Sequence, residues 1–255
     1  YVCTIENCPH FSDVFHMQQL LQQLGCTVSY EENTLVIDAR NLSMDTMSGE
    51  NVTGMRSSIT LLGAVLGRCR EVTMAYPGGC VIGQRPIDIH LSALRKMGVT
   101  IYEKEGCFTA RVKSLEGAVI NLPISSVGAT ENVILAAVMA RGVTVLQNAA
   151  KEPEIATLCE FLREAGAVIE GIGGSVLIIQ GGHELHGVSF RVPADRIVAG
   201  TYLMSVIGAG GNVFLEDAPA SQMRGMLKIA DEIGAQIHIS REGLHVIADE
   251  HKRAL

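Results

Sequence analysis

The stretch "LCEFLREAGAVI" (residues 158–169) has the pattern of an amphipathic helix that stops at a glycine and continues as an apolar, β-rich run. Three further stretches share this pattern: "MQQLLQQLGCTV" (17–28), "LSALRKMGVTI" (91–101) and "MLKIADEIGAQI" (226–237). Their glycines, Gly25, Gly98, Gly166 and Gly234, are 73, 68 and 68 residues apart. Because glycine suits the left-handed residue that follows a helix, the pattern predicts a chain of repeated modules.

The module around the opening stretch can be followed from residue 117 to residue 181. Its helical patterns are "SVGATENVILAAVMARG" (126–142) and "EPEIATLCEFLREAG" (152–166), each preceded by a strand-like run, "GAVINLP" (117–123) or "VTVLQNAA" (143–150). A hairpin of "AVIEGIG" (167–173) and "SVLIIQG" (175–181) closes the module, which gives the order βαβαββ. The first helix is apolar nearly all round, so we expect an α/β (α+β) fold with helices inside and strands outside.

The repeat also sets the expected domain boundaries. Residues 1–190 hold three modules, and the first of them starts directly on a strand-like run, "YVCTIENCP" (1–9), without an apolar helix before it. Residues 191–255 hold a fourth module, which we expect to be the first unit of a second domain. The sequence is therefore expected to be a piece of a longer repeat protein.

Composition excludes several classes of protein. The 255 residues are 47% hydrophobic and 18% charged, enough to build a sizeable core. The net charge of -7 comes without basic blocks, which argues against a nucleic-acid partner. No apolar run is long enough for a membrane span and no signal pattern opens the chain, so a cytoplasmic location is expected.

Seven cysteines occur at scattered positions, an odd number without paired spacing. This pattern predicts that most of them are buried, reduced thiols. A metal site at Cys3, Cys8, His10 and His16 is disfavoured, because their spacing is irregular and no C-x-x-C occurs.

The stretch "YPGGCVIGQRPIDIH" (76–90) places a single thiol, Cys80, in a glycine-rich loop before a predicted helix. Pro86 suits the first turn of that helix, and Asp88 adds favourable negative charge at its positive end. The N–H groups of a helix start, together with the guanidinium of Arg85, form a combination that binds phosphate or carboxylate. Taken alone, such a loop is more often structural than catalytic.

Corresponding points of other modules carry similar features. In "SSVGATEN" (125–132), Ser126 is a natural N-cap, and Gly128 allows close approach to the backbone N–H groups. "GMRSSITLLG" (54–63) and "PADRIVAG" (193–200) place Arg56 and Arg196 at the same point of their modules. Capping alone and a solvated surface arginine are the simpler interpretations of each feature by itself.

Together, "PGGCVIGQRPIDIH" (77–90), "MRSSI" (55–59), "SVGAT" (126–130) and "KEPEI" (151–155) closely resemble the enolpyruvate transferase family. The resemblance runs through essentially the whole chain and is to the members that act on UDP-N-acetylglucosamine. The cysteine loop is its specific part, because the members that act on shikimate 3-phosphate lack this loop. The resemblance implies six βαβαββ units in two domains, an inside-out α/β barrel.

The resemblance also implies a reaction. Phosphoenolpyruvate adds to the 3′-hydroxyl of UDP-N-acetylglucosamine through a tetrahedral ketal, and phosphate is then eliminated, which is the first committed step of peptidoglycan synthesis. Both substrates are small molecules, and no cofactor, metal ion, nucleic acid or membrane is implied. Cys80 matches the general acid toward the methylene carbon of phosphoenolpyruvate and can form a covalent adduct with it.

Arg85 is implied as a second catalytic residue, and Arg85 and Arg56 match arginines that hold the anionic substrates. The substrate-binding residues that the resemblance implies are Arg56, Arg85, Pro86, Ile87, Asp88, Ile89, Ile124, Ser125, Ser126, Val127 and Arg196. Ile124 departs from members that have lysine there, so a charge contact to the nucleotide is not expected at this position.

The family's lysine–asparagine pair, its catalytic aspartate and further arginines have no counterpart in these 255 residues. We therefore expect that the chain alone does not turn over, although it retains weak affinity for the nucleotide sugar. The alternatives are a non-catalytic repeat module that binds phosphate or a nucleotide, and a purely structural scaffold. The intact cysteine loop disfavours both, because neither needs a thiol there.

Overall fold

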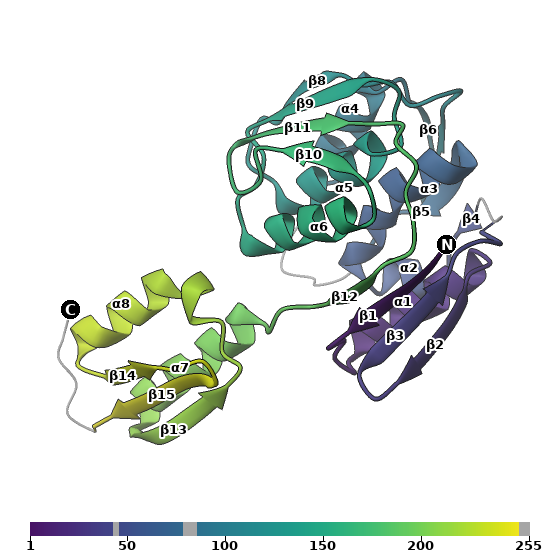
Figure 1. The fold of residues 1–255 in the computed structure, drawn as a ribbon. Helices are drawn as coiled ribbons and strands as arrows, with labels where there is room; N and C mark the ends of the chain where they lie inside the picture. Colours follow the sequence, from purple (N-terminus) through teal and green to yellow (C-terminus); the bar gives the residue numbers. More distant parts are fainter. Residues whose placement is uncertain (43–45, 79–85, 250–255) are drawn as a thin grey trace. The chain divides into compact units, whose positions relative to one another are not determined.

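A computed structural model describes residues 1–42, 46–78 and 86–249 of the chain. Contacts divide the chain into two compact units, Tyr1–Arg191 and Val192–Leu255 (Figure 1). The described strands form four separate sheets, three in the first unit and one in the second. No helix among the described residues is both long and apolar enough to cross a bilayer.

The third module has the predicted βαβαββ order. Its elements are β8 (Val119–Asn121), α5 (Val127–Ala137), β9 (Val143–Gln147), α6 (Pro153–Glu164), β10 (Val168–Glu170) and β11 (Val176–Gln180). The sheet has the order β10-β11-β9-β8, in which only β8 and β9 are parallel. Helix α5 is buried on several faces, which confirms that the first helix of this module is enclosed.

The second module repeats this plan with an added helical turn. Its elements are β4 (Thr46–Met47), α2 (Glu50–Thr53), the 3₁₀ helix η1 (Arg56–Thr60), α3 (Leu61–Cys69), β5 (Glu71–Ala75), α4 (Asp88–Lys96), β6 (Thr100–Lys104) and β7 (Cys107–Arg111). Its sheet order, β4-β5-β7-β6, is equivalent to that of the third module. The cysteine loop thus connects β5 to α4, where the third module connects β9 to α6.

The first module acquires its fourth strand from a distant part of the chain. Its own elements are β1 (Val2–Glu6), α1 (Ser12–Gln23), β2 (Thr27–Glu31) and β3 (Thr34–Asp38). The strand β12 (Ser189–Arg191) pairs in parallel with β1, in the position that β4 and β8 hold in their sheets. The strand β12 thus completes a four-stranded sheet with the order β12-β1-β3-β2.

The second unit holds one module with a smaller core. Its elements are α7 (Arg196–Ala209), β13 (Gly211–Glu216), the 3₁₀ helix η2 (Ala220–Gln222), α8 (Arg224–Ile233), β14 (Gln236–Ile239) and β15 (Gly243–Ala248). Its sheet has three strands in the order β13-β15-β14. In the sequence, β12 precedes α7 and takes the place of the first strand of this module. In the structure, however, β12 pairs with β1 and belongs to the sheet of the first module.

Each predicted glycine follows its helix with a positive φ. The φ angles of Gly25, Gly98, Gly166 and Gly234 are 96°, 92°, 104° and 106°. A side chain is disfavoured in this conformation, so glycine ends the helix and redirects the chain into the following strand. The four repeated stretches therefore share one backbone geometry.

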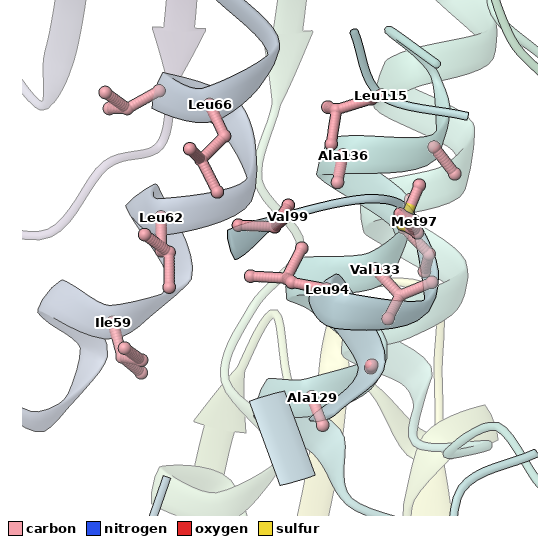
Figure 2. Packing of buried hydrophobic residues seen from close by; sticks show 14 of the residues in the cluster. Ile59, Leu62, Leu66, Leu94, Met97, Val99, Leu115, Ala129, Val133 and Ala136 are labelled. Carbon is pink, nitrogen blue, oxygen red and sulfur yellow. The ribbon is translucent and has the colours of Figure 1, made fainter. Parts of the chain in front are cut away.

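The core of the first unit lies where helices of the second and third modules meet. Figure 2 shows Leu62 and Leu66 on α3, Leu94 and Met97 at the end of α4, and Val133 on α5 as parts of one cluster. All five side chains are fully buried. Burying each apolar side chain stabilises the fold by about 2 kcal/mol, so this packing fixes the helices relative to one another.

Candidate functional site

The starts of three helical segments lie together in the first unit. Helix α4 starts at Asp88, α5 starts at Val127, and η1, which runs into α3, starts at Arg56. Both α4 and η1 contact α5. Nη2 of Arg56 donates a hydrogen bond of 3.2 Å to the carbonyl oxygen of Pro86. Unpaired N–H groups of a first helical turn attract anions, so this corner combines two helix starts with a guanidinium group.

A cavity of about 430 Å³ opens beside Arg56. Its lining includes four predicted site residues: Arg56, Pro86, Ile87 and Asp88. Predicted residue Ile89 lies instead in the wall of a smaller cavity of about 100 Å³, which Asp88 also lines. The fold at the start of α4 thus brings these four predicted residues together around one cavity.

Three polar residues of the larger cavity were missed by the sequence analysis. Oη of Tyr76 donates to Oε2 of Glu103 at 3.0 Å, and Nη2 of Arg95 donates to Oε1 of the same carboxylate at 3.2 Å. Arg95 belongs to the repeated stretch 91–101 and Glu103 follows it on β6, where charges are typical of a solvated face. Of the three residues, only Tyr76 could have been suggested by the sequence, because it is the first residue of the stretch that contains the cysteine loop.

The start of α5 is fixed by its own side chains. Oγ of Ser126 accepts a hydrogen bond from the backbone N–H of Ala129 at 3.4 Å, which confirms the predicted N-cap. Oγ of Ser125 donates to the carbonyl oxygen of Ala149 at 3.3 Å. Ile124 is 61% exposed, although it is a large apolar residue. The stretch 124–127 therefore presents a capped helix start with an exposed apolar side chain beside it.

A buried histidine joins α4 to α5. His90 is only 6% exposed, and its Nδ1 lies 2.9 Å from Nδ2 of Asn132. Burial, and to a lesser extent the charge of Arg56, lower the pKa of His90 to about 4, against a smaller opposite effect of Asp88. His90 is therefore neutral at pH 7, and the positive charge of this corner comes from Arg56 and the helix starts.

Glu131, in the second turn of α5, has the opposite shift. Burial, and to a lesser extent the carboxylate of Glu154 on α6, raise its pKa to about 7. A large fraction of this carboxyl group is thus protonated near neutral pH, which reduces the negative charge on α5.

A family model described as EPSP synthase (3-phosphoshikimate 1-carboxyvinyltransferase) matches residues 1–253. The chain belongs to the EPSP synthase family. This membership confirms the resemblance that the loop and helix-start motifs predicted.

Two members of the EPSP synthase family show the similarity in detail. The chain is 38% identical over 254 residues to "UDP-N-acetylglucosamine 1-carboxyvinyltransferase 2" of Caldanaerobacter subterraneus subsp. tengcongensis, covering all of this chain and 61% of the relative. It is 42% identical over 249 residues to "UDP-N-acetylglucosamine 1-carboxyvinyltransferase" of Chlorobium chlorochromatii, covering 97% of this chain and 59% of the relative. The chain thus spans about 60% of the length of these relatives.

Solved structures of the family share the fold. The enolpyruvyl transferase NikO from Streptomyces tendae superposes with a TM-score of 0.86 at 20% identity, over 98% of this chain and 60% of that chain. EPSP synthase from Acinetobacter baumannii gives a TM-score of 0.72 at 19% identity, over 97% of this chain and 59% of that chain. These similarities confirm the α/β fold of the enolpyruvate transferase type.

Three further outcomes concern the predicted site residues. Pro86 lies two residues before α4, whose first residue is Asp88, so its prediction as part of the first helical turn is wrong; Ile87 occupies the N-cap. Arg196 starts α7 in the second unit, behind the N-cap Asp195. Cys80 and Arg85 lie outside the residues that the structure describes.

Six cysteines lie in the described part of the chain, and all six are free thiols. Cys8, Cys26 and Cys159 are buried, whereas Cys3, Cys69 and Cys107 are partly exposed. Burial raises the pKa of Cys159 to about 11, with a smaller contribution from Glu160. A thiol in this state is a poor nucleophile and a poor metal ligand, so Cys159 is a core residue. Within the described ranges, no three metal-ligating side chains lie together.

Proposed function

We propose that the chain is part of an enolpyruvyl transferase that acts on UDP-N-acetylglucosamine and phosphoenolpyruvate in peptidoglycan synthesis. The curated relatives with this name support the proposal, since they match the chain along nearly its whole length. The observation that carries it is the hydrogen bond from Arg56 to the carbonyl oxygen of Pro86, just before α4, together with the contacts that η1 and α4 make with α5. Both proposed substrates are anionic, and this corner supplies a cation and unpaired N–H groups.

The proposed reaction has two steps. The sugar 3′-hydroxyl gives up its proton to solvent as its oxygen forms a bond to C2 of phosphoenolpyruvate, while the thiol of Cys80 gives its proton to the C3 methylene. The resulting tetrahedral ketal then returns a proton from C3 to the Cys80 thiolate and releases phosphate from C2, which restores the enol double bond. In this proposal Arg85 and Arg56 hold the anionic groups. Pro86, Ile87, Asp88, Ile89 and the stretch 124–127 contact the sugar nucleotide, and Arg196 is proposed as a further substrate-binding residue.

The charge of the site constrains the proton on Cys80. A free thiol has a pKa of about 8.5, and a helix start or a neighbouring arginine lowers it, whereas a general acid must keep its proton. Bound phosphate and carboxylate groups disfavour the thiolate and raise the pKa again. Cys80 is thus reactive when the site is empty and a competent acid when it is filled. The profile of alkylation rate against pH should move to higher pH when both substrates are present. Identical profiles with and without substrates would contradict the proposed change in the pKa of Cys80.

Intact-protein mass spectrometry tests the proposed chemistry directly. The Cys80 sulfur can also add to C2 of phosphoenolpyruvate while the thiol proton passes to C3, which leaves a covalent adduct. After incubation with phosphoenolpyruvate and UDP-N-acetylglucosamine, we therefore expect a mass increase that Cys80→Ser abolishes and Cys107→Ser preserves. Cys107 is the matched control because it is a partly exposed thiol on β7. Nucleotide binding without any adduct in the wild-type chain would favour the alternative of a non-catalytic binding module.

The 255 residues alone are expected not to release product, since the family's further catalytic groups have no counterpart here. Robust turnover by the purified chain would contradict this expectation.

The proposal also assigns a role to each part of the chain. Residues 1–190 serve as the substrate domain, and residues 191–255 as the first unit of a second domain. A cytoplasmic location is proposed because both substrates are phosphorylated molecules that do not cross a bilayer unaided.

A further inference from the structure

Asn132 is a fully buried amide that makes three hydrogen bonds to three different segments. Its Oδ1 accepts from the backbone N–H of Gly63 at 2.6 Å. Its Nδ2 donates to the carbonyl oxygen of Ile59 at 2.7 Å and lies 2.9 Å from Nδ1 of His90. Asn132 on α5 therefore links η1, α3 and α4 through one side chain.

These partners fix the orientation of the amide. If the amide were turned over, Nδ2 would face the N–H of Gly63 and Oδ1 would face the carbonyl oxygen of Ile59. Both contacts would be repulsive, one between two donors and one between two acceptors. The amide nitrogen must therefore point at His90, so Nδ1 of His90 accepts and carries no proton.

The other edge of the imidazole lies against the start of α5. A Cβ atom added to Gly128 would lie 3.0 Å from Cε1 and 3.4 Å from Nε2 of His90. In a neutral ring whose Nδ1 accepts, Nε2 carries the proton. The described residues provide no hydrogen-bond acceptor for this N–H. A donor is thus held beside the first turn of α5 without a partner in that part of the chain.

The geometry points to Asn132 as a positioning residue, which holds His90 as its neutral Nε2–H tautomer so that a bound phosphate group at the α5 start receives one more hydrogen bond. This inference rests on the proposed function for its ligand and on the hydrogen bonds alone for the tautomer. The charged groups near His90 are Arg56 on η1 and Asp88 on α4. A neutral donor serves an anion here without adding a second cation beside Arg56.

Histidine nitrogen NMR tests the tautomer without any ligand. In ¹⁵N-labelled wild-type chain, long-range ¹H–¹⁵N spectra should show His90 as a single Nε2–H tautomer from pH 8 to pH 5; His90→Phe assigns the signals. Asn132→Asp replaces the amide N–H groups by a carboxylate oxygen, so Nδ1 should gain a proton. Asn148→Asp is the matched control, because its Nδ2 also donates to a backbone carbonyl, that of Leu122 at 2.9 Å.

A proton on Nδ1 of His90 in the wild-type chain overturns the inference. The same holds if Asn132→Asp folds and leaves the His90 signals unchanged. If Asn132→Asp fails to fold, the wild-type spectrum alone decides the tautomer, because it needs no variant at that position.

Titration with UDP tests the role of the donor. UDP should shift the Nε2 signal of His90, and His90→Phe should weaken UDP binding on the order of tenfold, the loss of one hydrogen bond to a charged group. His183→Phe, at an exposed histidine, should bind UDP as the wild type does. If UDP binds but neither effect occurs, the ligand-facing role is overturned. If UDP does not bind the wild-type chain, the proposed nucleotide binding and this role both fail, while the spectra still decide the tautomer.

Discussion

At the scale of single residues, Glu131 couples the stability of the first unit to pH. Its pKa is raised from 4.5 to about 7 by burial and by Glu154, so the folded chain binds its proton more tightly than the unfolded chain. The stabilisation is complete below pH 4.5 and is lost as the pH rises through 7. A shift of this size corresponds to about 3 kcal/mol.

We predict that Glu131→Gln raises the free energy of unfolding at pH 8 by about 2 to 3 kcal/mol and changes it little at pH 4.5. The amide stays neutral, so it avoids the cost of burying a charge at high pH. Urea unfolding at the two pH values measures this. Glu164→Gln at the exposed end of α6 should have little effect at either pH, and an equal effect of Glu131→Gln at both would contradict the explanation.

His90 produces the opposite pH dependence. Its pKa is lowered to about 4 by burial and by Arg56, so the unfolded chain binds the proton more tightly. The folded state therefore loses stability as the pH falls from 6.5 toward 4. Together, the two residues favour folding most in mildly acidic solution, where both are neutral.

At the scale of elements, the contact between α3 and α5 depends on the absence of a side chain at Gly63. A Cβ atom there would lie 2.3 Å from the carbonyl oxygen of Asn132 and 2.8 Å from its Oδ1. The two helices approach closely enough at this point for the backbone N–H of Gly63 to reach Asn132 Oδ1. The absence of a side chain at Gly63 therefore allows both the close approach of the two helices and the hydrogen bond that holds Asn132 beside His90.

We predict that Gly63→Ala lowers the free energy of unfolding by about 3 kcal/mol, because the methyl group must separate the helices and break a buried hydrogen bond. Thermal and urea unfolding measure the loss. Ser92→Ala, on the exposed side of α4, is the control and should change stability by less than about 0.5 kcal/mol. If Gly63→Ala is as stable as this control, the α3–α5 contact is not as tight as described.

At the scale of the whole molecule, the first unit is completed by the strand that precedes the second. The strand β12 pairs in parallel with β1 through Thr4, Ile5 and Glu6. The carbonyl oxygen of Val188 also accepts from the N–H of Thr4 at 2.9 Å. The boundary between the two units therefore lies after a strand that is part of the first sheet.

We predict that a chain ending at Arg191 retains a cooperative unfolding transition, whereas a chain ending at Gly187 is less stable by several kcal/mol. The shorter chain loses the parallel strand and leaves the backbone groups of β1 unpaired on one side. Thermal unfolding followed by circular dichroism compares the two. Equal midpoints would contradict the structural role of β12.

Sequence alone determined the features that a residue and its near neighbours impose. The helix period, the glycines with positive φ and the Ser126 cap each reflect a local backbone conformation, so the βαβαββ order and the start of α5 could be predicted. The repeat spacing then extended one module to the whole chain. The cysteine loop and the two helix starts were likewise visible as local patterns.

Only the tertiary structure decided which distant groups meet. His90 and Asn132 are 42 residues apart, and neither belongs to a pattern that marks a partner. Tyr76, Arg95 and Glu103 join in one cavity because a strand and a helix of the module return to the same point. The strand β12 pairs with β1 rather than within its own module. Such contacts depend on how modules pack, and local periodicity carries no information about that.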